Sequence, residues 1–217
     1  MDEVIPLDPG QRARFPRVQL SSMSARKILI LQGHPDSAAP HLCHALADAY
    51  VHGAVAAGHD VRRIDIAGLA LPLLATQAAF EHEAPPPGAA AAQADIAWAD
   101  HIVLIFPLWL GTMPALVKGF LEQVLRPNFA FAYTPNGFAK KLLGGRSARL
   151  FVTMGMPALV YRWYFLAHGL KGLERNILVF AGIAPVRTTL FGGVGTAGAT
   201  TRIGWLAKMR ALGRDGV

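Results

Sequence analysis

Residues 27–37 read KILILQGHPDS, an apolar run followed by a segment rich in turn-forming residues. The consecutive aliphatic side chains at 28–31 are typical of a strand that is buried on both faces of a parallel sheet. A helical stretch over 41–57 follows, and Gly58 occupies the position at which a helix commonly ends. Residues 59–66 then alternate between polar and apolar side chains, which indicates a strand with one wetter face. The stretch therefore predicts a strand–helix–strand unit.

The same alternation continues to the end of the chain. We predict further strands over 101–106, 148–153 and 186–191, and further helices over 89–99, 114–125, 158–169, 173–181 and 200–212. The prolines of 85–88 indicate a linker that excludes helix. Strands that alternate with helices predict an α/β fold, a doubly wound five-stranded parallel sheet with helices on both faces. The apolar strands at 28–31 and 102–106 belong in its centre, and 59–66 lies nearer an edge.

Length and composition indicate one folded domain. The chain has 217 residues, of which 53% are hydrophobic and 16% are charged, so intrinsic disorder of the whole chain is excluded. Residues 1–24 contain several prolines and no apolar period, which predicts a flexible extension ahead of a single domain over 25–217. Cys43 is the single cysteine and no signal-peptide pattern opens the chain, so we expect a reduced, cytoplasmic location.

Charge is distributed unevenly along the chain. The net charge of +7 divides into −4 for residues 1–117 and +11 for residues 118–217. A basic half suits a phosphorylated cofactor or an anionic surface, but no nucleic-acid-binding motif accompanies it, so no nucleic-acid partner is predicted. His41, His44 and His52 fall along one helix without a partnering side chain at ligand spacing, so no metal site is predicted.

Ligands of doubly wound sheets bind beyond the carboxyl ends of the strands, which directs attention to the loops 32–41, 107–114 and 153–158. The first loop leads into a helix N-terminus, where free N–H groups favour an anion such as a phosphate. His34 and Ser37 are the candidate donors there. An ordinary turn, in which Asp36 or Ser37 caps the helix, is the alternative interpretation.

The second and third loops suit a flat aromatic ligand. The second is too apolar for a solvent loop, and Gly111 permits close approach of the backbone to a ligand. The third offers a hydroxyl, N–H groups and a glycine. A loop that packs on its own core or in a subunit contact is the alternative. The candidate ring-binding residues are Pro107, Leu108, Trp109, Leu110, Gly111, Thr153, Met154, Gly155 and Met156.

Two motifs carry a family resemblance. Residues 106–120 read FPLWLGTMPALVKGF and residues 129–133 read FAFAY, and in this order and separation they resemble signatures of the flavodoxin-like NAD(P)H:quinone oxidoreductases. Residues 27–35 are similar to the first strand and phosphate loop of that family, and the resemblance extends over about 27–212. It implies a flavodoxin-like fold, a bound flavin, and a homodimer with its active site at the subunit interface.

The resemblance also implies roles for individual residues. It places the flavin phosphate near His34 and Ser37, the ring against 107–110, and the pyrimidine side of the ring against Thr153, Gly155 and Met156. Tyr161 and His168 stand near the positions of two family residues that steady charge during hydride transfer. The second glycine of the family's third loop is absent here and the spacing to His168 differs. Packing for Tyr161, and a helix end for His168, are the alternatives.

The implied activity is flavin-dependent hydride transfer from NAD(P)H to a quinone or similar acceptor by a ping-pong mechanism. FMN is favoured over FAD because no motif demands room for an adenylate. Two other classes remain: a regulatory flavoprotein subunit of a potassium efflux antiporter, with a peripheral contact to that membrane protein, and a flavodoxin-type electron carrier.

Overall fold

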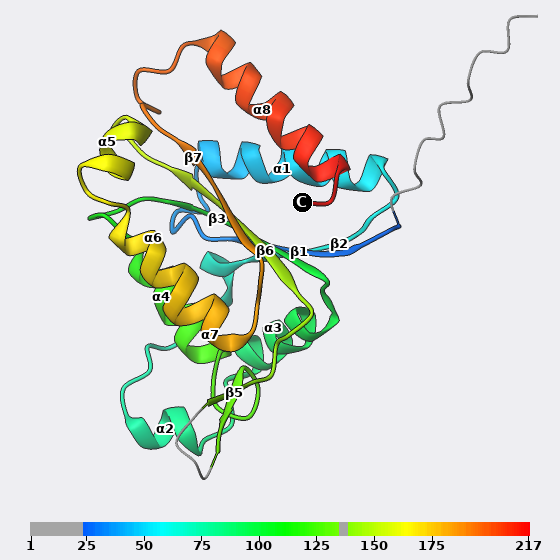
Figure 1. The fold of residues 1–217 in the computed structure, drawn as a ribbon, viewed down its shortest axis with the longest axis vertical. Coiled ribbons are helices and arrows are strands. Elements are labelled where there is room, and N and C mark those ends of the chain that lie inside the picture. The colour runs from blue at the N-terminus through cyan, green and yellow to red at the C-terminus, as the bar shows by residue number, and fades with distance from the viewer. Residues whose placement is uncertain (1–23, 135–138) are drawn as a thin grey trace, which may run out of the picture.

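The computed structural model describes residues 24–134 and 139–217. Apart from Ser24, the predicted N-terminal extension therefore lies outside the described residues. Five parallel strands form the main sheet in the order β2-β1-β3-β6-β7 (Figure 1). Their bounds are Lys27–Gln32 (β1), Asp60–Asp65 (β2), His101–Pro107 (β3), Ser147–Thr153 (β6) and Val186–Phe191 (β7). The predicted five-stranded parallel sheet is confirmed, with the apolar β1 and β3 inside it and the alternating β2 at an edge.

Helices cover both faces of this sheet. One face is buried beneath α1 (Leu42–Ala56) and α8 (Ala199–Arg214), and the other beneath α3 (Pro87–Trp98), α4 (Ala115–Val124) and the helical segment 168–181 (Figure 1). Side chains of β1 alternate between the two cores: Ile28 and Ile30 face α1, whereas Leu29 and Leu31 face the opposite layer. This alternation explains why β1 is apolar at every position, since both of its faces are buried.

The segment 168–181 is continuous but not uniform. It consists of α6 (His168–Gly172), a π-helical stretch Leu173–Leu178 and α7 (Val179–Ala181). The prediction of one helix over 158–169 was wrong. It breaks after α5 (Ala158–Trp163), because Leu166 and Ala167 adopt left-handed backbone conformations with φ of 54° and 50°.

Four short elements were not predicted. They are a 3₁₀ turn at Ile66–Leu69, α2 (Gln77–Glu81), and an antiparallel pair formed by β4 (Phe131–Tyr133) and β5 (Ala139–Lys141). The predicted linker also ends earlier than expected, because Pro87 occupies the first turn of α3, where a missing N–H costs no hydrogen bond. No helix in 24–134 or 139–217 has the length and apolarity needed to span a membrane.

The helices α1 and α8 pack in unusually close contact. A Cβ atom added at Gly53 of α1 would overlap the carbonyl oxygen of Arg210 in α8. A Cβ atom added at Gly213 of α8 would in turn overlap the carbonyl oxygen of Tyr50. The two glycines therefore allow the backbones of the helices to touch, which fixes α8 against α1.

Candidate functional site

The candidate site lies at the carboxyl ends of β1, β3, β6 and β7. The chain leaves β1 toward α1 on one face and leaves β3 toward α4 on the other, so the winding reverses between these two neighbouring strands. A cavity of about 400 Å³ opens there, a volume within the range of small-molecule sites. Its lining comes from four loops and the start of α1: His34, His41, Leu42, Cys43, Pro107, Leu108, Trp109, Thr153, Met154, Gly155, Val194 and Gly195.

The first loop starts with a glycine that no larger residue can replace without movement. A Cβ atom at Gly33 would lie 2.6 Å from Val117 Cγ2, and the Gly33 N–H donates to the carbonyl of Ile105 at 2.8 Å. His34 follows and is nearly buried. Ser37 is exposed and does not line the cavity, and α1 begins only after His41, so neither Asp36 nor Ser37 caps that helix.

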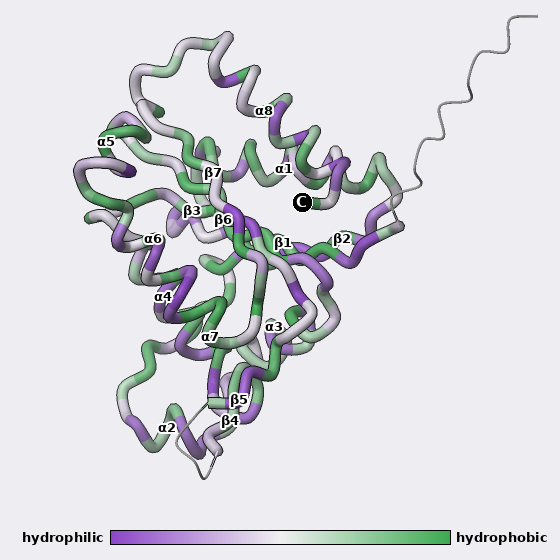
Figure 2. The backbone as a smooth tube through the Cα atoms, viewed as in Figure 1, coloured by the Kyte–Doolittle hydropathy of each residue, from purple (hydrophilic) through white to green (hydrophobic). Residues whose placement is uncertain are grey.

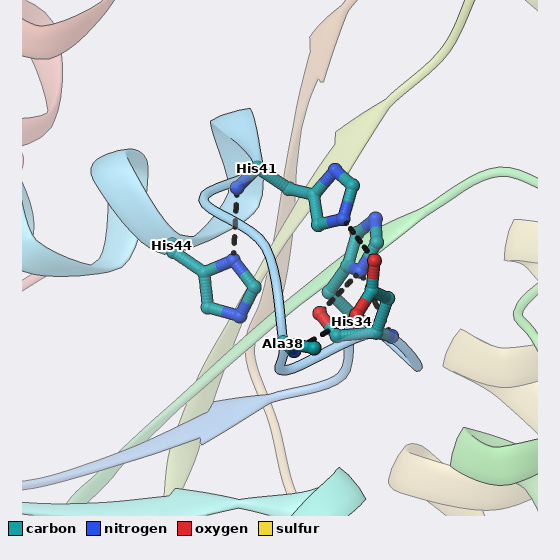
Figure 3. A network of polar contacts seen from close by, with 5 residues as sticks. His34, Ala38, His41 and His44 are labelled. Carbon is teal, nitrogen blue, oxygen red and sulfur yellow. Dashed lines mark hydrogen bonds and ion pairs between the residues drawn. The ribbon is translucent and has the colours of Figure 1, made fainter.

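Asp36 is held by two partners (Figure 3). One carboxylate oxygen accepts the Ala38 N–H at 2.8 Å, and the other lies 2.8 Å from Nε2 of His41. The hydrogen bond from His41 is the first cause that keeps the pKa of this carboxyl below its ordinary value. The carboxylate is thus engaged by its own loop.

Three imidazole rings gather where the first loop enters α1 (Figure 3). The rings of His34 and His41 stack, and the His44 ring lies 5.5 Å from His34 and 5.9 Å from His41. Burial is the main cause that lowers the pKa of His34, and the neighbouring His41 and His44 lower it further. The hydrogen bond between His34 and the backbone of Asp36 raises this pKa in part. Of the described residues, no group of three His, Cys, Asp or Glu side chains is arranged to hold a metal ion. The cluster instead presents imidazole N–H groups at a helix N-terminus.

The second loop contains a two-residue turn. Trp109 and Thr112 exchange backbone hydrogen bonds of 2.9 and 3.0 Å, while Leu110 and Gly111 take positive φ of 48° and 79°, as such turns require. Pro107, Leu108 and Trp109 line the cavity, whereas Leu110 and Gly111 do not. Gly111 permits this turn, and its predicted approach to a ligand stays a prediction.

The third loop meets the start of α1 inside the cavity. Thr153 Oγ1 lies 3.3 Å from Cys43 Sγ, and burial raises the pKa of the Cys43 thiol to about 11, so it is neutral at physiological pH. Within the described chain, the N–H of Gly155 makes no hydrogen bond and is available to a ligand. Met156 does not line the cavity.

A fourth loop, after β7, was not predicted to contribute. Val194 and Gly195 line the cavity, and the Val194 N–H donates to the carbonyl of Met154 at 3.1 Å. The glycine run at 192–195 was the signal in the sequence. A Cβ atom at Gly192 would overlap the Ala158 nitrogen, so this loop can approach the third loop only with glycine there.

Tyr161 and His168 lie outside the cavity lining. Tyr161 is buried, and its hydroxyl donates to the Gly111 carbonyl at 2.9 Å, which fastens the second loop to α5. Burial raises the pKa of this phenol. His168 is exposed at the first position of α6. Their catalytic roles stay predictions.

Apolar side chains are exposed beside the cavity opening. The contact between Tyr161 and Gly111 brings α5 next to the Trp109–Thr112 turn, and Figure 2 shows α5 as a largely hydrophobic segment. Trp163 is 73% exposed and the Leu110 side chain is fully exposed. The set comprises Trp109, Leu110, Leu159, Val160, Trp163, Tyr164, Phe165 and Leu166, and we call it the aromatic patch.

A second, more enclosed cleft of about 230 Å³ lies between α4 and α7. Phe80, Phe131 and Phe180 contribute to its lining, and the charges of Lys118 and Glu122 on its rim neutralise one another in an ion pair. Its lining offers few polar groups to orient a ligand, so we place the functional site at the switch point of the sheet instead.

Comparisons with known proteins agree with this topology. Residues 26–211 match the family described as having a flavodoxin-like fold. The chain belongs to this family, and the flavodoxin-like architecture predicted from the sequence is confirmed. An NAD(P)H:quinone oxidoreductase from Methanothermobacter marburgensis superposes with a TM-score of 0.75 at 20% identity, over 88% of this chain and 97% of that one. This likeness concerns the fold alone.

Curated relatives share parts of the sequence. An uncharacterized NAD(P)H oxidoreductase of Haemophilus influenzae is 34% identical over 44% of this chain and 48% of its own length. An FMN-dependent NADH:quinone oxidoreductase of Burkholderia lata is 28% identical over 58% of this chain and 66% of its own. The matched region thus spans about half to two thirds of the length of these relatives.

Proposed function

We propose that the protein is a flavin-dependent NAD(P)H oxidoreductase that reduces a quinone or a similar acceptor. The observation that carries the proposal is the switch-point cavity, in which an imidazole cluster at a helix N-terminus adjoins apolar walls. Curated relatives with FMN-dependent quinone reductase names, and a structural neighbour described as an azoreductase in complex with FMN, support it.

The residues of the cavity fit FMN. The first N–H groups of α1 have no partner within the helix, and together with His34 and His41 they would hold the phosphate. Pro107, Leu108 and Trp109 would line the isoalloxazine ring, with the free N–H of Gly155 at its polar edge. When bound, the flavin would supply hydride acceptance from NAD(P)H and two-electron transfer to the quinone.

The protein's own part is placement and exclusion of water. The hydrogen bond from Tyr161 to Gly111 holds the turn that carries Trp109, and the bond from Leu108 N–H to Thr153 O, at 2.7 Å, ties the second loop to the third. A donor and an acceptor that use one open space in turn would give ping-pong kinetics. The basic half of the chain favours NADPH, the more highly charged nicotinamide, as the electron donor.

We also infer a homodimer formed through the aromatic patch. Exposed apolar side chains gathered on one surface commonly mark an interface, and this patch adjoins the cavity opening. A partner subunit there would complete the wall of the ligand space. The cytoplasmic location, the membrane-protein contact and the antiporter-subunit alternative stay predictions.

The proposal is tested by the visible spectrum of the purified protein before and after anaerobic NADPH or NADH, with the released cofactor identified by mass. Flavin bands that bleach, and that return on addition of a quinone, support it. Gly155→Phe fills the cavity, whereas Gly144→Phe places the same ring in open space beyond the amino end of β6. We expect only the first variant to lose flavin. A colourless wild-type protein that takes up no added flavin contradicts the proposal.

A further inference from the structure

Polar and charged side chains gather at the amino ends of β1, β3, β6 and β7, at the opposite end of the sheet from the flavin cavity. His101 of β3 pairs in register with Ser147 of β6, and Arg149 of β6 pairs with Arg187 of β7. Alternation along each strand places all of them on the face that carries α1 and α8, because Val103, Phe151 and Phe191 belong to that core. Arg26, immediately before β1, completes the group.

Two buried polar atoms of this group have no partner in the part of the chain that the structure describes. His101 is 3% exposed; its Nδ1 lies 2.8 Å from Ser147 Oγ, but its Nε2 is unsatisfied. Arg149 is 9% exposed and donates to Thr189 Oγ1 at 3.2 Å, while its Nε is unsatisfied. Buried polar groups in native proteins are nearly always hydrogen-bonded, so each orphan calls for a ligand or water.

The guanidinium groups also lack counter-charges. Among residues 24–134 and 139–217, no carboxylate lies within 4 Å of Arg26, Arg149 or Arg187. Nearby Asp100 instead accepts the backbone N–H of Lys27, and Asp215 lies beside Arg214. Of the three, Arg149 is buried, Arg26 is half-buried and donates from Nη1 to the Gly216 carbonyl at 2.7 Å, and Arg187 is exposed. A buried cation without an ion pair is costly, and an anion bound beside Arg149 would reduce that cost.

A cavity is present to receive such an anion. It measures about 130 Å³ and is lined by Arg26, His101, Ser147 and Arg187, together with Ala148, Pro185 and Val217. At roughly 30 Å³ per water molecule, this space holds about four waters or one phosphate-sized group, and it is too small for a nucleotide. Arg149 lies next to it, beside Arg187 across the two strands.

The charged groups that act on His101 are cationic. Burial first, and then the positive charges of Arg26, Arg149 and Arg187 with the nearby His59, lower the pKa of His101 to about 3. The imidazole is therefore neutral at physiological pH. If Nδ1 accepts the Ser147 hydroxyl, Nε2 carries the proton and becomes a donor toward the cavity.

We propose that this cavity is a binding site for a phosphate group, held by the guanidinium groups of Arg26 and Arg187 and by the Nε2–H of His101. Planar guanidinium groups match the oxygens of phosphate, and the field of Arg149 adds to their attraction. The site is separate from the flavin cavity and does not depend on the proposed reductase activity. Free phosphate and the phosphate of a small monoester present the same chemistry to it.

The test is a calorimetric titration of inorganic phosphate into the purified protein at constant ionic strength, with and without saturating FMN, alongside the imidazole ¹⁵N resonances of His101. We expect saturable binding and a shift of the Nε2 resonance in both states. Arg187→Gln, at an exposed position, should weaken binding about tenfold, as the loss of one charge-assisted hydrogen bond does. Arg175→Gln removes the same charge from an exposed position on the opposite helix layer and should have no effect.

Titration of glycerol phosphate distinguishes a site for a monoester from a site for the free ion. Binding of glycerol phosphate indicates that the cavity opens to solvent and accepts a monoester, whereas binding of inorganic phosphate alone indicates a site for the free ion. His41→Ala reports on phosphate that binds at the start of α1 instead. Binding that disappears in His41→Ala and persists in Arg187→Gln overturns the proposal, as does the absence of any His101 shift at saturating phosphate. None of these outcomes depends on whether the protein carries a flavin.

Discussion

The imidazole rings of His34 and His41 stack with centroids 3.8 Å apart and planes inclined by 18°. One ring stands at the end of β1 and the other at the N-cap of α1, so the stack bridges the strand and the helix that define the switch point. The hydrogen bond between His41 Nε2 and the Asp36 carboxylate fixes the second ring (Figure 3). The stack therefore holds both rings in fixed positions at the start of α1.

We expect His41→Ala to weaken FMN binding. Because Nε2 of His41 bonds to Asp36, His41 would donate to the phosphate from a protonated Nδ1; the variant removes this donor and leaves His34 without its stacking partner. A hydrogen bond to a charged group contributes about 1.5 to 3 kcal/mol, so the dissociation constant should rise roughly 10- to 100-fold, as measured by flavin fluorescence quenching. His52→Ala, on an exposed position of the same helix, should bind FMN like the wild type. Equal affinities in the two variants would show that His41 does not contact the phosphate.

FMN affinity should depend on pH through His34. Burial lowers the pKa of His34 in the free protein, whereas a bound phosphate dianion favours the charged imidazole. Binding is then accompanied by proton uptake, and affinity rises as the pH falls from about 7 through the ordinary histidine value near 6.5. His34→Gln should flatten this dependence. A flat profile in the wild type would contradict the predicted role.

Stability against acid should depend on His101. Its pKa is about 3 in the folded protein, against an ordinary value of 6.5, so the unfolded chain binds an extra proton between these values. The free energy of unfolding should therefore fall as the pH decreases from 6.5 to 3, by an amount on the order of 4 kcal/mol for this residue. Urea unfolding at several pH values measures the slope. We expect His101→Gln to lose much of it and His52→Gln to retain it; identical slopes would refute the assignment.

Substitution of the contact glycines between α1 and α8 should destabilise the fold. Gly53→Ala places a methyl group on the Arg210 carbonyl, and overpacking of this kind costs about 1 to 3 kcal/mol. Gly204→Ala, in the interior of α8, meets open space and should stabilise by roughly 0.5 to 1 kcal/mol, because alanine is the better helix former. Chemical denaturation distinguishes the two. A neutral Gly53→Ala would mean that the helices separate without cost.

The aromatic patch should control the oligomeric state. Trp163→Gln removes a 73%-exposed indole from the patch and should shift a dimer toward monomer, as seen by light scattering over a range of protein concentrations. Ile203→Gln, at an apolar position on α8 that is 65% exposed, serves as the control and should leave the mass unchanged. A wild-type protein that is monomeric at all concentrations would contradict the inferred homodimer.

The sheet was predictable because its signal is local. Uninterrupted apolar runs identify β1 and β3, and their place in the middle of the sheet follows from burial on both faces. Three of the four loops that line the cavity were predicted from topology alone, since all parallel strands end at the same edge. Of the residues predicted to bind the ligand, those nearest the strand ends line the cavity: His34, Pro107, Leu108, Trp109, Thr153, Met154 and Gly155.

The features that were not predicted depend on where helices begin and end. A sequence pattern defines these boundaries poorly. Ser37 was expected near the phosphate because the loop was taken to enter the helix close to it, whereas the N-cap of α1 is His41. His41 thus became a site residue that was not predicted. The break between α5 and α6 arises from left-handed Leu166 and Ala167, residue types that give no warning of such a conformation.

The contact between α1 and α8 also has a consequence for biosynthesis. Helix α1 is made early, but the helix that covers it emerges from the ribosome only after every strand of the sheet has been synthesised. Until then Tyr50, which is fully buried in the finished protein and whose carbonyl lies against Gly213, lacks part of its cover. A growing chain that has not yet reached α8 should therefore be a good substrate for chaperones, and a stalled one should aggregate.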